Sequence, residues 1–372
     1  MAFTTRYDEI LAQVKAVDPL QYGRTRNYLN GAVTRLSPYI SRGVISTREV
    51  FDTMLAKGIA PAQMESFIKE LAWRDYFQQV WIALGDEIQN DIKRPQPDAS
   101  SKGIPKALLH ATTGIEAIDN NIRELQATGY MHNHVRMYTA SLACNLARCH
   151  WQVPARWMHY YLLDADGASN TLSWQWVAGS FSGKKYYANQ ENINRYCNTM
   201  QSGTFLDQPY ESLESMDVPD VLKPIENPEF RTALPECHTP VIDTSLPTYI
   251  YNFYNLDCMW DNHITANRIL LLEPSFFERY PVCEKTITFI LNLSHNIPGI
   301  QPFTGEFHEL QLHTGNSKIH FKEHPTARHY RGTEHPRAWM FENVKGYYPS
   351  FFAYWKQCEK QLKKQFSIKT TA

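Results

Sequence analysis

The sequence lacks the long apolar run that a membrane-spanning helix needs, since no stretch of about 18 consecutive apolar residues occurs in it. Its first residues also lack the basic-then-apolar layout of a secretory signal. Neither sign of charge is in excess, because 37 Lys and Arg stand against 38 Asp and Glu, for a formal net charge of −1. We therefore expect no membrane association, and any surface for nucleic acid must be a local basic patch.

Cysteine is scarce and unpatterned. The chain has seven cysteines, an odd number, and no two of them form a CxxC pair. This pattern predicts neither a disulfide framework nor a zinc site, and it favours reduced thiols in the cytoplasm. His320 and His324 stand four apart, but their segment is expected to be extended and ends in Pro325. No metal is therefore predicted.

Aromatic residues, in contrast, are abundant. The 372 residues include nine Trp and 21 Tyr, which suit stacking on flat ligands, although large cores use them too. Helical apolar spacing runs through the first 200 residues, a stretch rich in Pro, Ser and Asp follows, and strand-like runs begin near 248. We predict a mainly α protein: a helical domain at 1–235, a linker at 236–247, and a small α/β domain of unassigned role at 248–372.

The string DADGASNTLSWQW, residues 164–176, gathers two carboxylates, one amide and two indoles within thirteen residues. A buried Asp can accept hydrogen bonds from a ligand, and an Asn can direct its amide at a ring nitrogen. Arg136 lies in an otherwise mostly apolar helical stretch, and a buried guanidinium needs a carboxylate partner. Asp164 or Asp166 could provide it. The alternative is a tryptophan-rich turn in the core.

Two further stretches offer ligand chemistry. TRLSPYISRG (34–43) places the hydroxyls of Thr34 and Ser37 beside Arg35, a set that can hold a phosphate, although it also fits a simple capped loop. ELAWRDYF (70–77) sets Glu70, Trp73 and Arg74 on neighbouring faces of a helix. The alternative there is an ordinary amphipathic helix with a Glu70–Arg74 ion pair.

Taken in order, these stretches and TGIEAIDNNIRELQATGYMHNHVRM resemble the flavin-binding domain of the photolyase/cryptochrome family over about residues 7–225. The resemblance implies an all-helical domain that holds FAD, with Asp166 near the pyrimidine edge of the flavin, Asp164 paired with Arg136, and Asn170 facing flavin N5. The positions that match the family's FAD contacts are Tyr22, Thr34, Arg35, Leu36, Ser37, Phe67, Arg74, Asn133, Arg136, Asp164, Ala165, Asp166 and Asn170.

The resemblance also implies a substrate. Glu70, Trp73, Asn133, Met137 and Trp176 match the residues that hold a cyclobutane pyrimidine dimer, and Asn170 resembles the residue that favours a stable reduced flavin in photolyases. Indoles stack on flipped bases and a carboxyl bonds their polar edges. We therefore predict light-driven, FAD-dependent repair of pyrimidine dimers in DNA, that is, a deoxyribodipyrimidine photo-lyase. The alternatives are a cryptochrome-like blue-light sensor and a binding protein that has lost the flavin.

The remaining predictions concern electron relay and DNA. Trp174 and Trp151 match the first two members of the family's electron-transfer chain, and a third has no obvious match. The expected DNA contacts are Trp73, His134, Lys184, Lys185 and Arg195. The resemblance begins near residue 7, so we expect the flavin domain to lack the family's usual N-terminal α/β domain ahead of it. No antenna chromophore is therefore assigned, and a monomer is expected.

Overall fold

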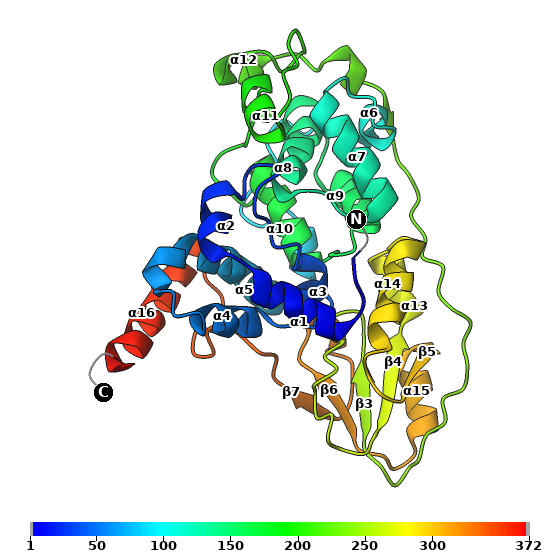
Figure 1. The fold of residues 1–372 in the computed structure, drawn as a ribbon. Helices are drawn as coiled ribbons and strands as arrows, with labels where there is room; N and C mark the ends of the chain where they lie inside the picture. Colours follow the sequence, from blue (N-terminus) through cyan, green and yellow to red (C-terminus); the bar gives the residue numbers. More distant parts are fainter. Residues whose placement is uncertain (1–2, 370–372) are drawn as a thin grey trace.

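The protein, described here by a computed structural model, is defined for the backbone of residues 3–369 and for side chains as far as residue 364. Helices fill the N-terminal part, and a parallel sheet with its own helices follows (Figure 1). The N-terminal elements are α1 Tyr7–Ala16, α2 Pro19–Thr25, α3 Ser37–Ser41, α4 Thr47–Leu55, α5 Glu65–Leu84, α6 Lys106–Leu109, α7 Glu116–Thr128, α8 Asn133–Ser141, α9 Gln152–Tyr161, α10 Gly167–Ala178, α11 Gln190–Cys197 and α12 Tyr210–Ser215, with the short strands β1 Ile104–Pro105 and β2 Ile225–Glu226.

The C-terminal part alternates strands and helices. Its elements are β3 Thr248–Tyr251, β4 Asn267–Leu272, α13 Pro274–Arg279, α14 Glu284–Ser294, β5 Ile300–Thr304, α15 Phe307–Thr314, β6 Ile319–Lys322, β7 Thr333–His335 and α16 Phe351–Lys369. Short turns of other helix types lie at η1 Pro61–Met64, η2 Gly85–Gln89, η3 Leu142–Leu146 (a π-helix), η4 Asp220–Leu222 and η5 Pro325–Ala327. Among the described residues, no helix combines the length and apolarity needed to cross a membrane.

Local sequence signals account for several element ends. Ser46 caps α4 by accepting from the backbone N–H of Glu49, while the Glu49 carboxylate accepts from the backbone N–H of Ser46. Gly129 and Gly179 end α7 and α10 in the left-handed conformation, which glycine adopts without a Cβ clash. The helical order predicted for the N-terminal part therefore follows from patterns that lie within each segment.

The C-terminal sheet is parallel with the strand order β5-β4-β3-β6-β7. Its first strand, β3, lies in the middle, and all residues of β3 and β4 are buried, as expected where helices cover both faces. The chain runs outward from β3 to β5 on one side and then returns to β6 on the other. The boundary between β3 and β6 is therefore the point where the direction of the connections reverses.

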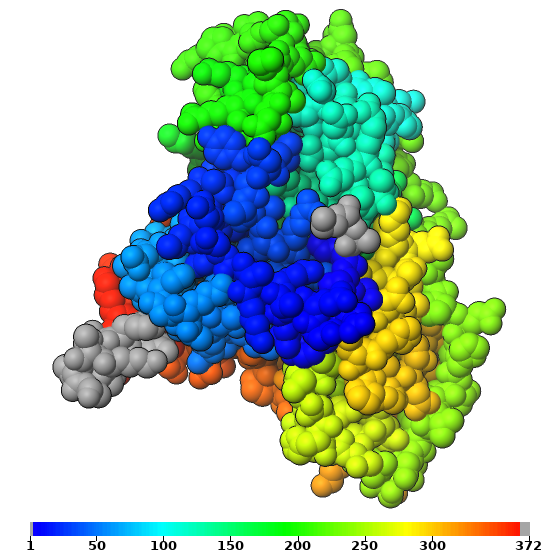
Figure 2. All heavy atoms as spheres, viewed as in Figure 1, coloured from blue at the N-terminus to red at the C-terminus, as the bar shows by residue number. Residues whose placement is uncertain are grey.

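The two parts share an extensive contact rather than a thin hinge. The N-terminal segment lies against α14, where the backbone N–H of Tyr7 donates to Asn296 at 3.0 Å and Phe3 packs edge-on to Phe289, and Figure 2 shows this segment beside the yellow elements. At the other end, α16 leaves the sheet and packs on α5 (Figure 1). The domain bounds stay a prediction, and positions 370–372 lie outside the described residues.

Gly167 offers a direct test of the packing between α10 and α5. A Cβ at Gly167 would lie 2.7 Å from the Trp81 ring, and Trp81 is fully buried. We expect Gly167→Ala to lower the unfolding free energy by about 1–3 kcal/mol, because a close-packed interior has no room for the methyl group. Urea denaturation measures this. Gly183→Ala, where no atom lies within 4 Å of the added Cβ, is the matched control. Equal midpoints for the two variants would contradict the packing.

Candidate functional site

Asp164 and Arg136 form the best-defined ion pair of the site. Asp164 precedes α10, Arg136 lies on α8, and one guanidinium nitrogen, Nη2, donates to both carboxylate oxygens at 3.1 and 3.0 Å. Arg136 Nε donates in turn to the carbonyl of Met131 at 2.8 Å. Burial raises the pKa of Asp164, but the Arg136 charge and a hydrogen bond with Ser37 outweigh it, so the net pKa is lowered. Asp164, rather than Asp166, is therefore the partner of Arg136.

Asp166 has a different role as the N-cap of α10. Its Oδ1 accepts from the backbone N–H of Ser169 at 2.6 Å, and its Oδ2 accepts from Nε2 of Gln78 at 2.7 Å. Two helices, α10 through Ser169 and α5 through Gln78, thus hold the Asp166 carboxylate in a single orientation. One turn further along α10, the amide of Asn170 donates to the Ala155 carbonyl of α9 at 2.9 Å.

The loop before α3 lies against the same carboxylates. Arg35 adopts a left-handed backbone with φ 53°, and its guanidinium lies 4.9 Å from the centre of the Tyr130 ring. Positive φ at a non-glycine residue is strained and gathers at functional sites. Ser41 donates to the backbone carbonyl of Asp164 at 3.0 Å and accepts from Arg74 of α5 at 2.7 Å. The end of α3, α5 and the segment before α10 therefore meet.

The other positions expected to contact FAD differ in how deeply they are buried. Tyr22 meets Phe67 edge-to-face at 5.1 Å, and the Ala165 carbonyl accepts from the Arg42 guanidinium. Asn133 is exposed at the start of α8. Of the full set, the buried members are Leu36, Phe67, Asp164, Ala165 and Asp166, and the partly buried members are Tyr22, Thr34, Arg35, Ser37, Arg74, Arg136 and Asn170.

Two of the residues expected to hold the lesion already contact other side chains of this chain. Glu70 pairs with Arg26 at 2.8 Å, so the alternative Glu70–Arg74 ion pair is wrong, and burial raises the pKa of the Glu70 carboxyl. The Trp73 ring stacks on Phe351 of α16, with centroids 3.8 Å apart and planes 9° apart. Trp176 is 37% exposed. One face of Trp73 is therefore already occupied by an aromatic ring of this chain.

Met137 and the two expected relay tryptophans occupy less exposed positions. Met137 is partly buried on α8. Trp174 and Trp151 are both buried, and Trp151 Nε1 donates to Asp91 at 2.7 Å. Trp157 is also buried, and its Nε1 has no hydrogen-bond partner within the part of the chain that the structure describes. All three indoles are therefore enclosed by protein rather than by solvent.

The expected DNA contacts divide into free and engaged side chains. Lys184 and Arg195 are exposed, whereas Lys185 Nζ lies 2.5 Å from a carboxylate oxygen of Asp98. His134 is partly buried, with Nδ1 3.0 Å from the carbonyl of Asn27 and its ring stacked on Tyr138. Lys184 and Arg195 are thus the basic groups of this set that are open to a phosphate.

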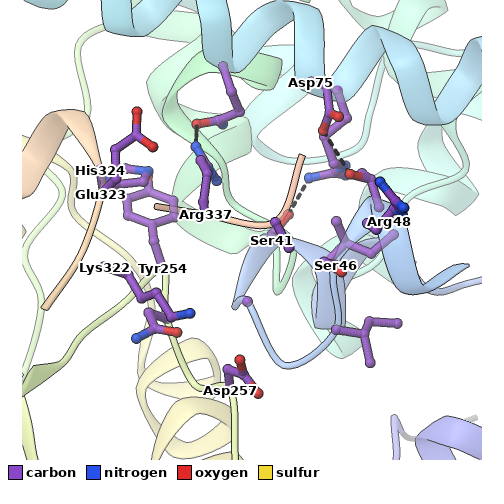
Figure 3. Close-up of a pocket in the computed structure, with 18 of the residues that line it drawn as sticks. Ser41, Ser46, Arg48, Asp75, Tyr254, Asp257, Lys322, Glu323, His324 and Arg337 are labelled. Atoms are coloured by element: carbon purple, nitrogen blue, oxygen red, sulfur yellow. Dashed lines mark hydrogen bonds between the residues drawn. The ribbon is translucent and has the colours of Figure 1, made fainter. Parts of the chain in front are cut away.

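A polar cavity of about 270 Å³ lies where the two parts of the chain meet (Figure 3). Its C-terminal wall follows the carboxyl ends of β3 and β6, and its N-terminal wall comes from α3, α4, α5 and Asp166. The labelled lining residues are Ser41, Ser46, Arg48, Asp75, Tyr254, Asp257, Lys322, Glu323, His324 and Arg337. The Asp166 wall places this cavity next to the cluster of cofactor positions.

Several residues of the site were not predicted from the sequence. Arg42 is fully buried, its guanidinium lies 3.5 Å from the Phe253 ring centre, and its Nε and Nη1 have no partner among the described residues. Arg42 stands in the stretch TRLSPYISRG, and an arginine with Ile40 and Val44 two positions away on either side was a usable signal. No comparable sequence signal pointed to Arg26, Gln78 and Arg337, because only the fold brings them to the site.

The donor set fits FAD. Arg35 and Arg74 lie by the loop with the expected phosphate-binding hydroxyls, and neither is in an ion pair within the described residues. Two cations without carboxylate partners suit a diphosphate. The buried Ser169 hydroxyl, beside Asp166, has no partner in that same part of the chain. Nor do the described residues contain a group of three or more His, Cys, Asp or Glu placed to hold a metal ion.

Comparison with known proteins agrees with this chemistry. Residues 67–239 match the family model of the FAD binding domain of DNA photolyase. A deoxyribodipyrimidine photo-lyase of Streptomyces griseus is 36% identical over 151 residues, which cover 40% of this chain and 32% of that protein. Cryptochrome DASH of Danio rerio is 30% identical over 190 residues, covering 49% of this chain and 35% of that protein.

A solved cryptochrome from Synechocystis sp. PCC6803 aligns at 26% identity with a TM-score of 0.48, over 53% of this chain and 44% of its own. The chain spans about a third of the length of the first curated relatives it matches. The fold and the site together define a helical flavin-binding protein. Residues 67–239 thus match the FAD binding domain of DNA photolyase, and FAD is the cofactor that this match and the site indicate.

Proposed function

We propose that this chain is a light-driven, FAD-dependent repair enzyme for cyclobutane pyrimidine dimers in DNA. The observation that carries the proposal is the geometry of α5. This one helix directs Arg74 toward Ser41 at the end of α3, while Trp73, the neighbouring residue, and Glu70, one turn before, stand at the positions expected to hold the dimer. A single rigid helix would then fix the substrate relative to the cofactor.

The chain's own groups have defined tasks in such a reaction. FAD, when bound, reduced and illuminated, supplies the electron that opens the cyclobutane ring. Arg136 and Asp164 brace the cofactor position, and Asp166 presents a fixed carboxylate to the polar edge of its ring. Trp73 stacks on the flipped bases, and the Glu70 carboxyl bonds their polar edges. DNA carrying the dimer is the proposed partner.

Trp73→Ala tests the proposal. We expect KM for an oligonucleotide with one thymine dimer to rise roughly 10-fold or more, because base stacking on an aromatic ring contributes about 1–3 kcal/mol. Flavin absorbance and photoreduction should persist. Light-dependent thymine recovery is measured against a dark sample. The matched control is Phe352→Ala, since Phe352 is 73% exposed on α16. No light-dependent recovery by the FAD-loaded, reduced wild-type protein would reject repair.

A blue-light sensor without repair activity is the second candidate, and one observation favours it. Phe351 covers one face of Trp73, the residue expected to stack on the lesion. In a sensor, this aromatic contact would keep α16 docked on α5, and flavin photoreduction would be the signal. Retained photoreduction together with absent repair in the wild type would favour this function.

A further inference from the structure

A chain of two hydrogen bonds joins the C-terminal segment to Asp166. Arg337, which follows β7, donates through Nη1 to Oε1 of Gln78 at 2.8 Å. Gln78 Nε2 donates in turn to Oδ2 of Asp166 at 2.7 Å. Figure 3 draws the first of these bonds, from Arg337 to a side chain on the helix α5. Arg337 and Gln78 stand 259 residues apart in sequence.

The chemistry of the three side chains determines which end of the Gln78 amide faces Asp166. The amide of Gln78 has an accepting oxygen and a donating nitrogen, so by itself it could face Asp166 with either end. A guanidinium can only donate. Arg337 therefore binds the oxygen of Gln78, and this leaves the NH₂ group to face the carboxylate. The reversed amide would set an oxygen against Asp166 and a nitrogen against the cation.

The surroundings of Gln78 also restrict the orientation of its amide. Gln78 is 3% exposed, so water does not compete for its amide. The other oxygen of Asp166 is held by the backbone of Ser169, which makes the Gln78 bond the second of two contacts that orient this carboxylate. No carboxylate lies within ion-pair distance of Arg337 among the described residues. Asp75 is the carboxylate with the largest electrostatic effect on Arg337 and Asp166 comes second, but only Asp166 is joined to Arg337 through the Gln78 amide.

We propose that Arg337 is a positioning residue for the flavin. Through Gln78 it sets the orientation of the Asp166 carboxylate, and its positive charge offsets the negative charge at the polar edge of the flavin. The inference depends on the position of Asp166 beside FAD that is part of the proposed function. It makes the segment after β7 a contributor to cofactor affinity and potential, although that segment has no expected contact with FAD.

The test is Arg337→Met, which keeps the length of the side chain and removes the donor and the charge. We expect FAD to bind the apoprotein about 10-fold more weakly, because a hydrogen bond to a charged group is lost in a buried chain. The midpoint potential of the bound flavin should fall, because a nearby cation favours the reduced form. Fluorescence titration and spectroelectrochemistry read these two quantities, and neither depends on repair.

Two variants sharpen the result. Arg337→Lys retains a charged donor and should restore FAD affinity to within about threefold of the wild type. Arg331→Met is the matched control, because Arg331 is exposed and lies just before β7, on the other side of this strand from Arg337. If Arg337→Met does not fold, Arg337→Gln replaces it, since an amide no longer selects the orientation of Gln78. Wild-type affinity and potential in the folded Met or Gln variant would overturn the proposal.

Failure of this inference can be told apart from failure of the proposed function. Wild-type protein that binds FAD while Arg337→Met binds it equally well rejects only the role of Arg337. Weaker binding in Arg337→Met supports that role even if the wild type repairs no DNA. Wild-type apoprotein that does not take up FAD overturns both.

Discussion

Replacing Asp164 by Asn should lower the unfolding free energy by about 3 kcal/mol and release FAD. Removing one member of a buried ion pair leaves the other without its counter-charge, which typically costs about 3–5 kcal/mol. The low end applies because Arg136 keeps 21% of its side chain exposed, whereas Asp164 keeps 4%. The same change uncouples the loop of Ser37 from α8, so the cofactor position loses its central brace. Urea denaturation and the flavin absorbance of the purified protein measure the two effects.

The loss of unfolding free energy caused by Asp164→Asn should depend on pH in a defined direction. The pKa of Asp164 is lowered in the folded protein, so its stabilising contribution is complete above the unfolded value of about 3.9 and disappears as pH falls through the folded value. The difference from the wild type should therefore shrink below about pH 4. Asp98→Asn, which breaks the exposed contact with Lys185, should leave the denaturation midpoint unchanged. A stable Asp164→Asn protein with bound FAD would contradict the prediction.

The second large effect is loss of stability in mild acid. His132, His159 and His324 are buried, and the Nε2 atom of each has no hydrogen-bond partner among the described residues. Burial lowers the pKa of His132 and of His159 to about 4 and that of His324 well below its ordinary value. Below about pH 6.5 the unfolded chain therefore takes up three protons that the folded chain does not. Stability is complete above that pH and falls as pH decreases toward 4.

Buried carboxyls offset part of this loss. Burial raises the pKa of Asp75 to about 6, so near pH 5 the folded chain gains a proton there that the unfolded chain lacks. About two protons of difference remain, which corresponds to a slope of about 3 kcal/mol per pH unit. Because a typical protein has only about 5–15 kcal/mol of stability, the midpoint in urea should collapse between pH 6.5 and 4.5.

A single substitution isolates the histidine contribution. His159→Gln removes one of the three titrating groups, so the slope of stability against pH should fall by about 1 kcal/mol per pH unit even if the variant is less stable throughout. His308→Gln removes an exposed histidine of the surface and serves as the control. An unchanged slope in His159→Gln would show that His159 does not resist protonation in the folded state.

Patterns within a few residues of each other were sufficient for much of the fold. The capping box at Ser46 and the apolar spacing from residue 65 to 84 are local, and the structure confirms both helices. The strand-like run that begins near residue 248 yields only a short strand, because β3 ends at Tyr251. Asn252 and Asn255 bridge each other in a turn there. Aromatic and apolar composition alone does not distinguish a strand from the buried turn that follows it.

The candidate site was likewise predicted in part from local sequence patterns, and the structure decided the rest. The residue types and spacing of DADGASN identified two carboxylates and an amide with ligand chemistry, and the four stretches together indicated the family. The spacing could not decide which aspartate pairs with Arg136, since both stand in one short loop. The structure assigns the pair to Asp164 and leaves Asp166 to α10 and Gln78.

The sequence by itself determined the helical character of the N-terminal part, the position of its motifs and the chemistry they offer, because these depend on local propensity and on side chains close along the chain. Only the tertiary structure decided that Arg26 pairs with Glu70, that Phe351 covers Trp73 and that Arg337 reaches Asp166 through Gln78. The Phe351 and Arg337 contacts join residues more than 250 positions apart. Packing of the C-terminal segment on α5 creates them, and no local pattern encodes that packing.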